Sequence, residues 1–199
     1  YIKTGGALFA LIDPGAPASV VAFLERYGFE LPDAVAVAPG RRLYAGELLT
    51  FRASPTTEAH QMIISVNAPP IFSLARVVRA FGNREGVLAR PILRTSASGW
   101  GSTDTALLVE GHSEFDPERD LAGPVVIAGE IAYEQDNGLG AQLLVFGDSD
   151  IANNKLFEQG GNKDLLVNAV NWLAEDIGQM AARPEAQETG RHQWILSAL

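Results

Sequence analysis

Blocks of apolar residues, separated by Gly, Pro and polar turns, predict an α/β domain. Four apolar runs have the length of buried strands: residues 7–12, 34–38, 125–132 and 142–146. Between the first two runs, apolar residues recur at helical spacing as far as Tyr27, and Gly28 follows as a stop signal. We therefore predict a β-α-β unit, whose two strands run parallel and are joined by a right-handed crossover.

The remaining pattern predicts a mixed sheet and two more helices. Residues 71–78 and 86–93 have the composition of strands, and Asp136-Asn137-Gly138 is a hairpin turn, which makes the last two apolar runs antiparallel. A short helix is predicted over 151–157, and a longer amphipathic one begins at Asn162 or Asp164 as its cap. The other predictions are a partly helical excursion over 41–67, a polar loop over 107–120 and an edge strand over 179–183.

Composition narrows the class of protein. The 199 residues suit a single α/β domain over 1–183, followed by a polar linker and a short apolar tail over 184–199. A net charge of −9 disfavours nucleic acid and anionic lipid as partners. The absence of cysteine excludes disulfides, thiolate metal sites and a cysteine nucleophile. No apolar run has the roughly 18 residues needed to cross a bilayer, so we expect any membrane segments of the parent protein to lie outside this sequence.

Several short motifs occur in one order along most of the chain. They are Tyr1-x-x-x-Gly5-Gly6 with Asp13-Pro14, Thr95-Ser96-x-x-x-Trp100, Gly123-Pro124, Gly147-Asp148-Ser149-Asp150 with Asn153, and Gly161-Asn162-x-Asp164 with Asn168 and Trp172-Leu173. This ordered set resembles the auxiliary proteins of uncharacterised ABC-type transport systems, including the gliding-motility auxiliary proteins.

The resemblance implies a fold, a location and partners. It implies a flavodoxin-like, class I glutamine-amidotransferase-like three-layer sandwich with a mixed, mostly parallel central sheet, here lacking its first β-α unit. It also implies a periplasmic or extracytoplasmic domain of a membrane-anchored protein, whose anchoring segments are absent from this chain and whose partners are an ABC permease and ATPase. The amidotransferase relatives use a cysteine nucleophile, so their chemistry does not transfer to a chain without cysteine.

The polar cluster Asp148-Ser149-Asp150 is the main candidate site. It follows an apolar run, and the carboxyl ends of strands are where open α/β sheets bind ligands. Two carboxylates and a hydroxyl could bind a cation, a glycan or another small molecule. Alternatively, Ser149 or Asp150 caps the next helix, and Asp148 accepts hydrogen bonds from loop N–H groups. Asp13, Thr95, Ser96 and Asn153 are expected at the same edge of the sheet.

Two other functions are alternatives to a binding role. In a hydrolase, Ser149 would be the nucleophile with Asp148 and Asp150 beside it and His60 or His112 as base, but the G-x-S-x-G elbow is not matched. A dimerising scaffold would use the apolar tail 194–199 to form a homodimer. The three histidines lack metal-ligand spacing. We predict a non-catalytic auxiliary domain that binds a ligand or partner, with no metal and no cofactor.

Overall fold

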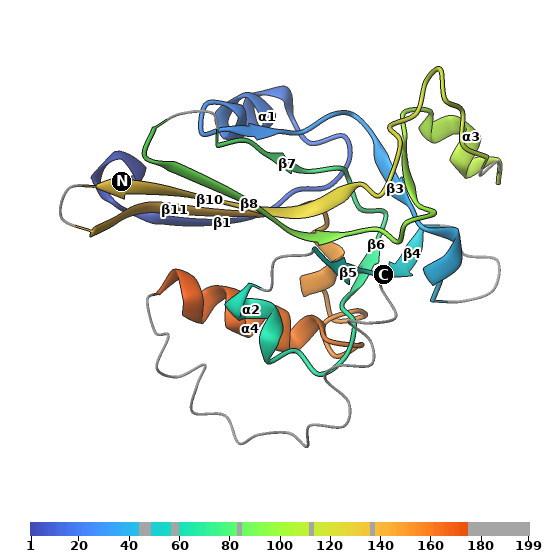
Figure 1. Ribbon diagram of the computed structural model, residues 1–199. Coiled ribbons are helices and arrows are strands. Elements are labelled where there is room, and N and C mark those ends of the chain that lie inside the picture. The colour runs from blue at the N-terminus through green and yellow to red at the C-terminus, as the bar shows by residue number, and fades with distance from the viewer. Residues whose placement is uncertain (44–48, 57–59, 83–84, 112–113, 136–137, 175–199) are drawn as a thin grey trace.

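A five-stranded sheet forms the centre of the protein in the computed structural model (Figure 1). The structure describes residues 1–43, 49–56, 60–82, 85–111, 114–135 and 138–174. The central sheet has the strand order β1-β11-β10-β8-β5, and its strands are β1 (Ala7–Leu11), β5 (Ser54–Pro55), β8 (Val87–Arg94), β10 (Val126–Gln135) and β11 (Gly138–Phe146).

The predicted mixed sheet is confirmed, but the prediction that it is mostly parallel is wrong. Among the described strands, β1 and β11 pair in parallel, with Ala7 opposite Gln142. The pairs β10–β11, β10–β8 and β5–β8 are all antiparallel. The antiparallel hairpin of β10 and β11 was predicted from its local sequence; its turn at residues 136–137 lies outside the described residues.

Both faces of the central sheet are covered. On β11, Leu144 and Phe146 belong to a core shared with helices α2 and α4, whereas Leu143 and Val145 belong to a core shared with helix α1. This alternation follows from the pleat, which points successive side chains to opposite faces. Each fully buried side chain of this size contributes about 1.5–3 kcal/mol to stability. The sheet therefore lies between α1 on one side and α2 and α4 on the other (Figure 1).

The helices are short apart from α4. They are η1 (Ile2–Thr4), α1 (Ala18–Glu25), η2 (Pro39–Arg41), α2 (Gln61–Ile64), α3 (Thr105–Val109), η3 (Asp150–Ala152) and α4 (Asn162–Leu173). The predicted helix before Gly28 is thus α1. The loop predicted over 107–120 instead begins inside α3, and the helix predicted over 151–157 is reduced to the 3-10 turn η3. No helix within the described ranges has the length and apolarity needed to span a membrane.

Three two-stranded ribbons surround the sheet, and they correct the predicted β-α-β unit. They are β2 (Phe29–Glu30) with β7 (Arg79–Ala80), β3 (Val35–Val37) with β9 (Trp100–Ser102), and β4 (Thr50–Arg52) with β6 (Ile71–Ser73). Strand β3 therefore pairs antiparallel with β9 and does not lie beside β1. The strand predicted over 71–78 is only β6. The predicted edge strand 179–183, the linker and the tail over 184–199 lie outside the described residues.

Candidate functional site

The carboxyl ends of three strands lie at one edge of the central sheet. Strands β8 and β11 are both antiparallel to β10, and β1 is parallel to β11, so β1, β11 and β8 run in the same direction. Asp13 follows β1, Asp148 follows β11 and Thr95 follows β8. Because β10 separates β11 from β8, the first two strand ends are adjacent and the third is one strand further away.

Asp13 and Ser149 form a direct pair between the ends of β1 and β11. The Ser149 backbone N–H donates to Asp13 Oδ1 at 2.6 Å, and the Ser149 hydroxyl donates to Asp13 Oδ2, also at 2.6 Å. Both oxygens of one carboxylate are thus engaged by a single serine. Asp13 is exposed and Ser149 is half-buried, so the pair lies at the surface, and each Asp13 oxygen keeps a lone pair for another donor.

Asp148 is almost completely buried beside this pair, at 1% exposure. Its Oδ2 accepts the Ser73 backbone N–H at 2.6 Å, and its Oδ1 accepts the Asp150 backbone N–H at 2.7 Å. Burial raises the pKa of Asp148 to about 7, and the neighbouring carboxylates Asp150 and Asp13 act in the same direction, while the two backbone N–H groups act against them. Through these two hydrogen bonds, Asp148 links β6 to the turn after β11.

Asp150 and Asn153 extend the same edge outward. The Asn153 side-chain amide donates to Asp150 Oδ1 at 2.9 Å, and its carbonyl oxygen accepts the Lys155 backbone N–H at 2.8 Å. Ser149 precedes η3 but makes no side-chain cap bond to it. Capping of this turn by Ser149 is therefore wrong, whereas the alternative that Asp148 accepts loop N–H groups is confirmed by its two bonds.

Thr95 and Ser96 do not join this network in the described part of the chain. Thr95 is buried, and its hydroxyl accepts the Val125 backbone N–H at 3.0 Å. The Ser96 hydroxyl lies 3.3 Å from that of Ser98. Both residues follow β8 as predicted, but Thr95 bonds the residue before β10, and Ser96 contacts Ser98 within the connection from β8 to β9.

Arg76 was missed by the sequence interpretation, although it lies against the same edge. It is 3% exposed, and its guanidinium donates to the backbone carbonyls of Asp13, Leu31 and Pro32. Burial lowers the pKa of Arg76, and Asp33 opposes this effect. The Arg76 carbonyl also lies so close to Gly147 that a Cβ at this position would clash with it. The Gly147 preceding the candidate site is thus required by close backbone packing.

A second buried polar pair was also missed. His60 Nε2 and Glu130 Oε2 are 2.9 Å apart, and both side chains are at most 5% exposed. His60 Nδ1 accepts the Met62 backbone N–H at 3.2 Å, so Nε2 carries the proton and donates it to Glu130. Trp172 packs edge-on against the imidazole, with ring centroids 5.1 Å apart. The sequence did carry a signal for this pair, because Glu130 is a charged residue inside the apolar run of β10. A charged residue buried in a strand requires a partner.

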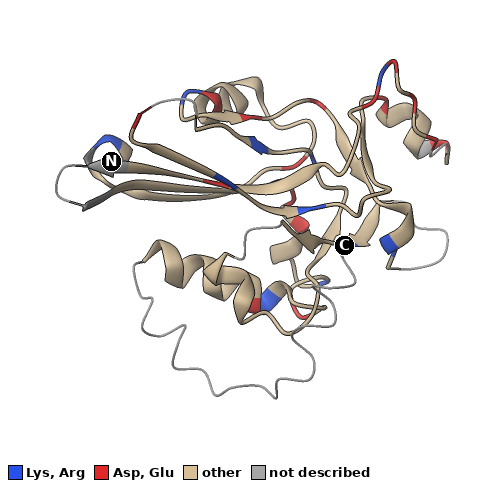
Figure 2. Cartoon of the chain, in the orientation of Figure 1, with Lys and Arg blue, Asp and Glu red and all other residues tan. Residues whose placement is uncertain are grey.

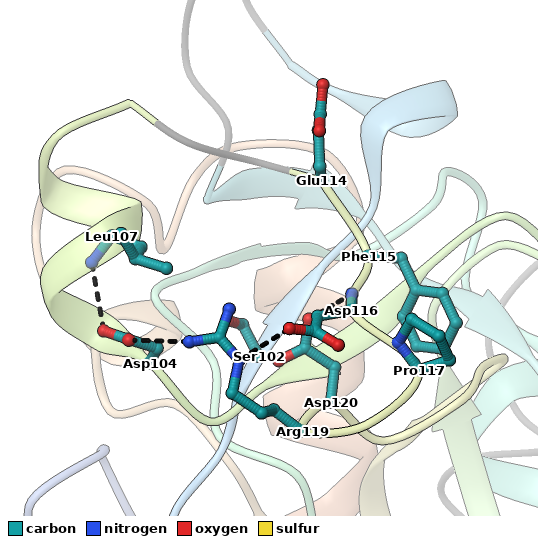
Figure 3. A pocket seen from close by; sticks show the side chains of 9 residues that line it. All are labelled: Ser102, Asp104, Leu107, Glu114, Phe115, Asp116, Pro117, Arg119 and Asp120. Carbon is teal, nitrogen blue, oxygen red and sulfur yellow. Dashed lines mark hydrogen bonds and ion pairs between the residues drawn. The ribbon is translucent and has the colours of Figure 1, made fainter.

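A pocket lies elsewhere, between β9, α3 and the following loop (Figure 3). This pocket has a volume of about 420 Å³. Its lining residues are Ser102, Asp104, Leu107, Glu114, Phe115, Asp116, Pro117, Arg119 and Asp120. Within the described residues, no group of three or more His, Asp or Glu side chains is arranged to hold a metal ion.

Taken together, these elements define a mixed α/β domain with a mostly antiparallel central sheet. No family model matches the chain, and no curated protein matches it. Among solved structures, it is similar to the mmIFT52 N-terminal domain, with a TM-score of 0.54 and 14% sequence identity over 94% of this chain and 70% of that chain. At this level of identity the similarity concerns the fold alone.

Proposed function

We propose that this chain is a non-catalytic, extracytoplasmic auxiliary domain of an ABC-type transport system, which binds a small ligand or a partner at the Asp13–Ser149 edge. The transport assignment rests on the ordered motifs that resemble the auxiliary proteins. The binding role rests on one structural observation, which is the carboxylate of Asp13 held at the surface by two 2.6 Å bonds from Ser149. An oriented, exposed carboxylate is suited to accept hydrogen bonds from hydroxyl or amine groups of a ligand.

The flavodoxin-like, three-layer interpretation of the fold belongs to the same proposal. In its favour, helices lie on both faces of the sheet (Figure 1), and β1 and β11 form the parallel pair at whose carboxyl ends the candidate site lies. In such sheets ligands bind outside the carboxyl ends of the strands.

The hydrolase alternative is less well supported by the same geometry. A serine nucleophile needs a base within hydrogen-bond reach, at about 2.6–3.2 Å. The Ser149 hydroxyl donates to Asp13, while His60 is held by Glu130 and the Met62 backbone. We expect Ser149→Ala to leave the background hydrolysis of generic esters unchanged. A loss of ester hydrolysis by about 100-fold or more in that variant would instead favour the enzyme.

The decisive experiment for the transport role uses the full-length parent protein in its own membranes. After mild detergent extraction and affinity purification, an ABC permease and its ATPase should be recovered with the tagged protein. A matched sample carrying Asp13→Ala tests whether the candidate edge takes part. Recovery of neither subunit, under conditions that keep other ABC complexes intact, would contradict the proposal.

A further inference from the structure

The acidic lobe, defined here as residues 102–120, carries an unusual share of the negative charge. It contains six Asp and Glu residues and a single Arg, in a chain whose net charge is −9. Figure 2 shows red segments around the helix labelled α3 in Figure 1 and along the loop after it. The pocket of about 420 Å³ lies in this lobe, within the roughly 300–1,000 Å³ range of ligand sites.

Two carboxylates of the acidic lobe bind the guanidinium of Arg119, which shows how the lobe could bind the guanidinium of a ligand. Arg119 Nε donates to Asp116 Oδ2 at 2.7 Å, and Arg119 Nη1 donates to Asp104 Oδ2 at 3.2 Å (Figure 3). Asp116 raises the pKa of Arg119, and the Glu118 backbone N–H with Arg119 lowers the pKa of Asp116, so both are charged at neutral pH. One arginine does not neutralise the four carboxylates that line the pocket.

Arg119 is shared among three of these carboxylates, because Asp120 also acts on its charge, and Glu114 makes no ion pair among the described residues. Asp120 accepts the backbone N–H groups of Thr103 and Asp116, which hold the loop but add no positive charge. Glu114 is exposed, and its side chain makes no ion pair within the described ranges. In Figure 3 it points away from the Arg119 cluster, toward the outside of the pocket. The pocket therefore presents net negative charge to an incoming ligand.

An aromatic wall gives the pocket a second feature that favours a basic side chain. Phe115 lines it and is 43% exposed. Trp100 packs behind Phe115, with ring centroids 6.3 Å apart. Trp100 is only 6% exposed, and its indole N–H has no acceptor in the described structure. An exposed aromatic face attracts a cation and packs against the methylene stem of Arg or Lys.

We propose that this pocket is a docking site for an arginine- or lysine-bearing segment of a partner polypeptide. The basic side chain lies against Phe115, and the net negative charge of the pocket balances its charge, with Glu114 on the outer side as the carboxylate that has no ion pair of its own among the described residues. Arginine suits the site better than lysine, because its planar guanidinium forms bidentate bonds with carboxylates and stacks on aromatic rings. This site is separate from the Asp13–Ser149 edge, so the proposal does not depend on the transport role.

The test measures binding of a short fluorescein-labelled peptide of arginine, glycine and serine to the 199-residue chain by fluorescence anisotropy. The same peptide with every arginine replaced by glutamine is the ligand control. Amide chemical shifts of the ¹⁵N-labelled protein locate the site, and we expect the affected amides to lie in the acidic lobe. Glu114→Lys should weaken binding about fivefold or more, and Phe115→Ala about two- to fivefold.

A matched charge reversal distinguishes a built site from general attraction. Glu25 is exposed on α1, outside the acidic lobe, and Glu25→Lys changes the net charge by the same amount as Glu114→Lys. We expect Glu25→Lys to leave the affinity within about twofold. The proposal would be overturned if the arginine peptide did not bind, or if the glutamine peptide bound equally well. It would also be overturned if the two charge reversals weakened binding equally, or if the amide chemical shifts changed only outside the acidic lobe. Calcium shifting the same amides while the peptide shifts none would assign the pocket to a cation instead.

Discussion

Replacing Asp148 by asparagine should change how stability depends on pH. The carboxyl is buried, and burial raises its pKa from 3.8 to about 7. Between these two pKa values the folded protein holds a proton that the unfolded chain releases. The free energy of unfolding therefore falls as pH rises through this window and is constant above it. A side-chain amide cannot ionise, so this part of the pH dependence is absent from the Asp148→Asn variant.

The magnitude follows from the shift. One pKa unit corresponds to about 1.4 kcal/mol, so between about pH 5 and pH 8.5 the Asp148 carboxyl removes roughly 2–3 kcal/mol from the stability of the unaltered chain. The variant keeps one carbonyl oxygen but turns an amide group toward the N–H of Ser73 or Asp150, which costs about 1–3 kcal/mol at either pH. The variant should be clearly less stable at pH 5 and close to the unaltered chain at pH 8.5.

Urea unfolding followed by tryptophan fluorescence at the two pH values measures this difference. The informative quantity is the change with pH of the stability difference between variant and unaltered chain, because other titrating groups cancel. Glu25→Gln, an exposed change of the same charge on α1, controls for net charge. A stability difference that is the same at both pH values would refute the reasoning, since it would mean that the two backbone N–H groups outweigh burial.

Two further changes test the buried polar contacts. Asn162 is fully buried, and its amide bonds the Ile71 N–H, the Ile71 carbonyl and the Leu156 carbonyl at 2.7–3.0 Å; Asn162→Ala should lower the free energy of unfolding by about 3–5 kcal/mol, and a loss below about 1 kcal/mol would contradict this account. His60→Ala leaves Glu130 buried without its partner and should lower the free energy of unfolding by about 3–5 kcal/mol. The double variant His60→Ala with Glu130→Ala should lose less stability than the sum of the losses in the two single variants. Additive losses in that cycle would show that the two side chains are not coupled.

Local sequence was sufficient for some elements of this fold and insufficient for their pairing. The helix before Gly28 and the hairpin of β10 and β11 were predicted because their signals lie within a few residues of one another. The parallel β-α-β unit was wrong because β1 pairs with β11 and β3 with β9. Those partners are distant in sequence, and nothing in an apolar run specifies which other run it pairs with.

The same limit applies to the candidate site. The position of Asp148 and Ser149 after a buried strand was predicted, because a polar cluster after an apolar run is a local signal. The strand order decides which partners these side chains meet. Asp13 accepts a hydrogen bond from Ser149, whereas Thr95 accepts one from Val125. Asn162 or Asp164 was expected to cap α4, but Gly161 stands at the cap position, and the buried amide of Asn162 bonds Ile71 of β6. These contacts join segments whose proximity only the assembled sheet creates.

The pairing of β1 with β11 has a consequence for folding during synthesis. Strand β1 is synthesised before its partner residues, from Gln142 to Phe146, and most of the described chain lies between them. Closing so long a loop is slow, and parallel pairing across it is correspondingly late. Until then, the apolar strand Ala7–Leu11 has no partner in the central sheet. During this interval the unpaired strand is the part of the central sheet most prone to associate with other chains.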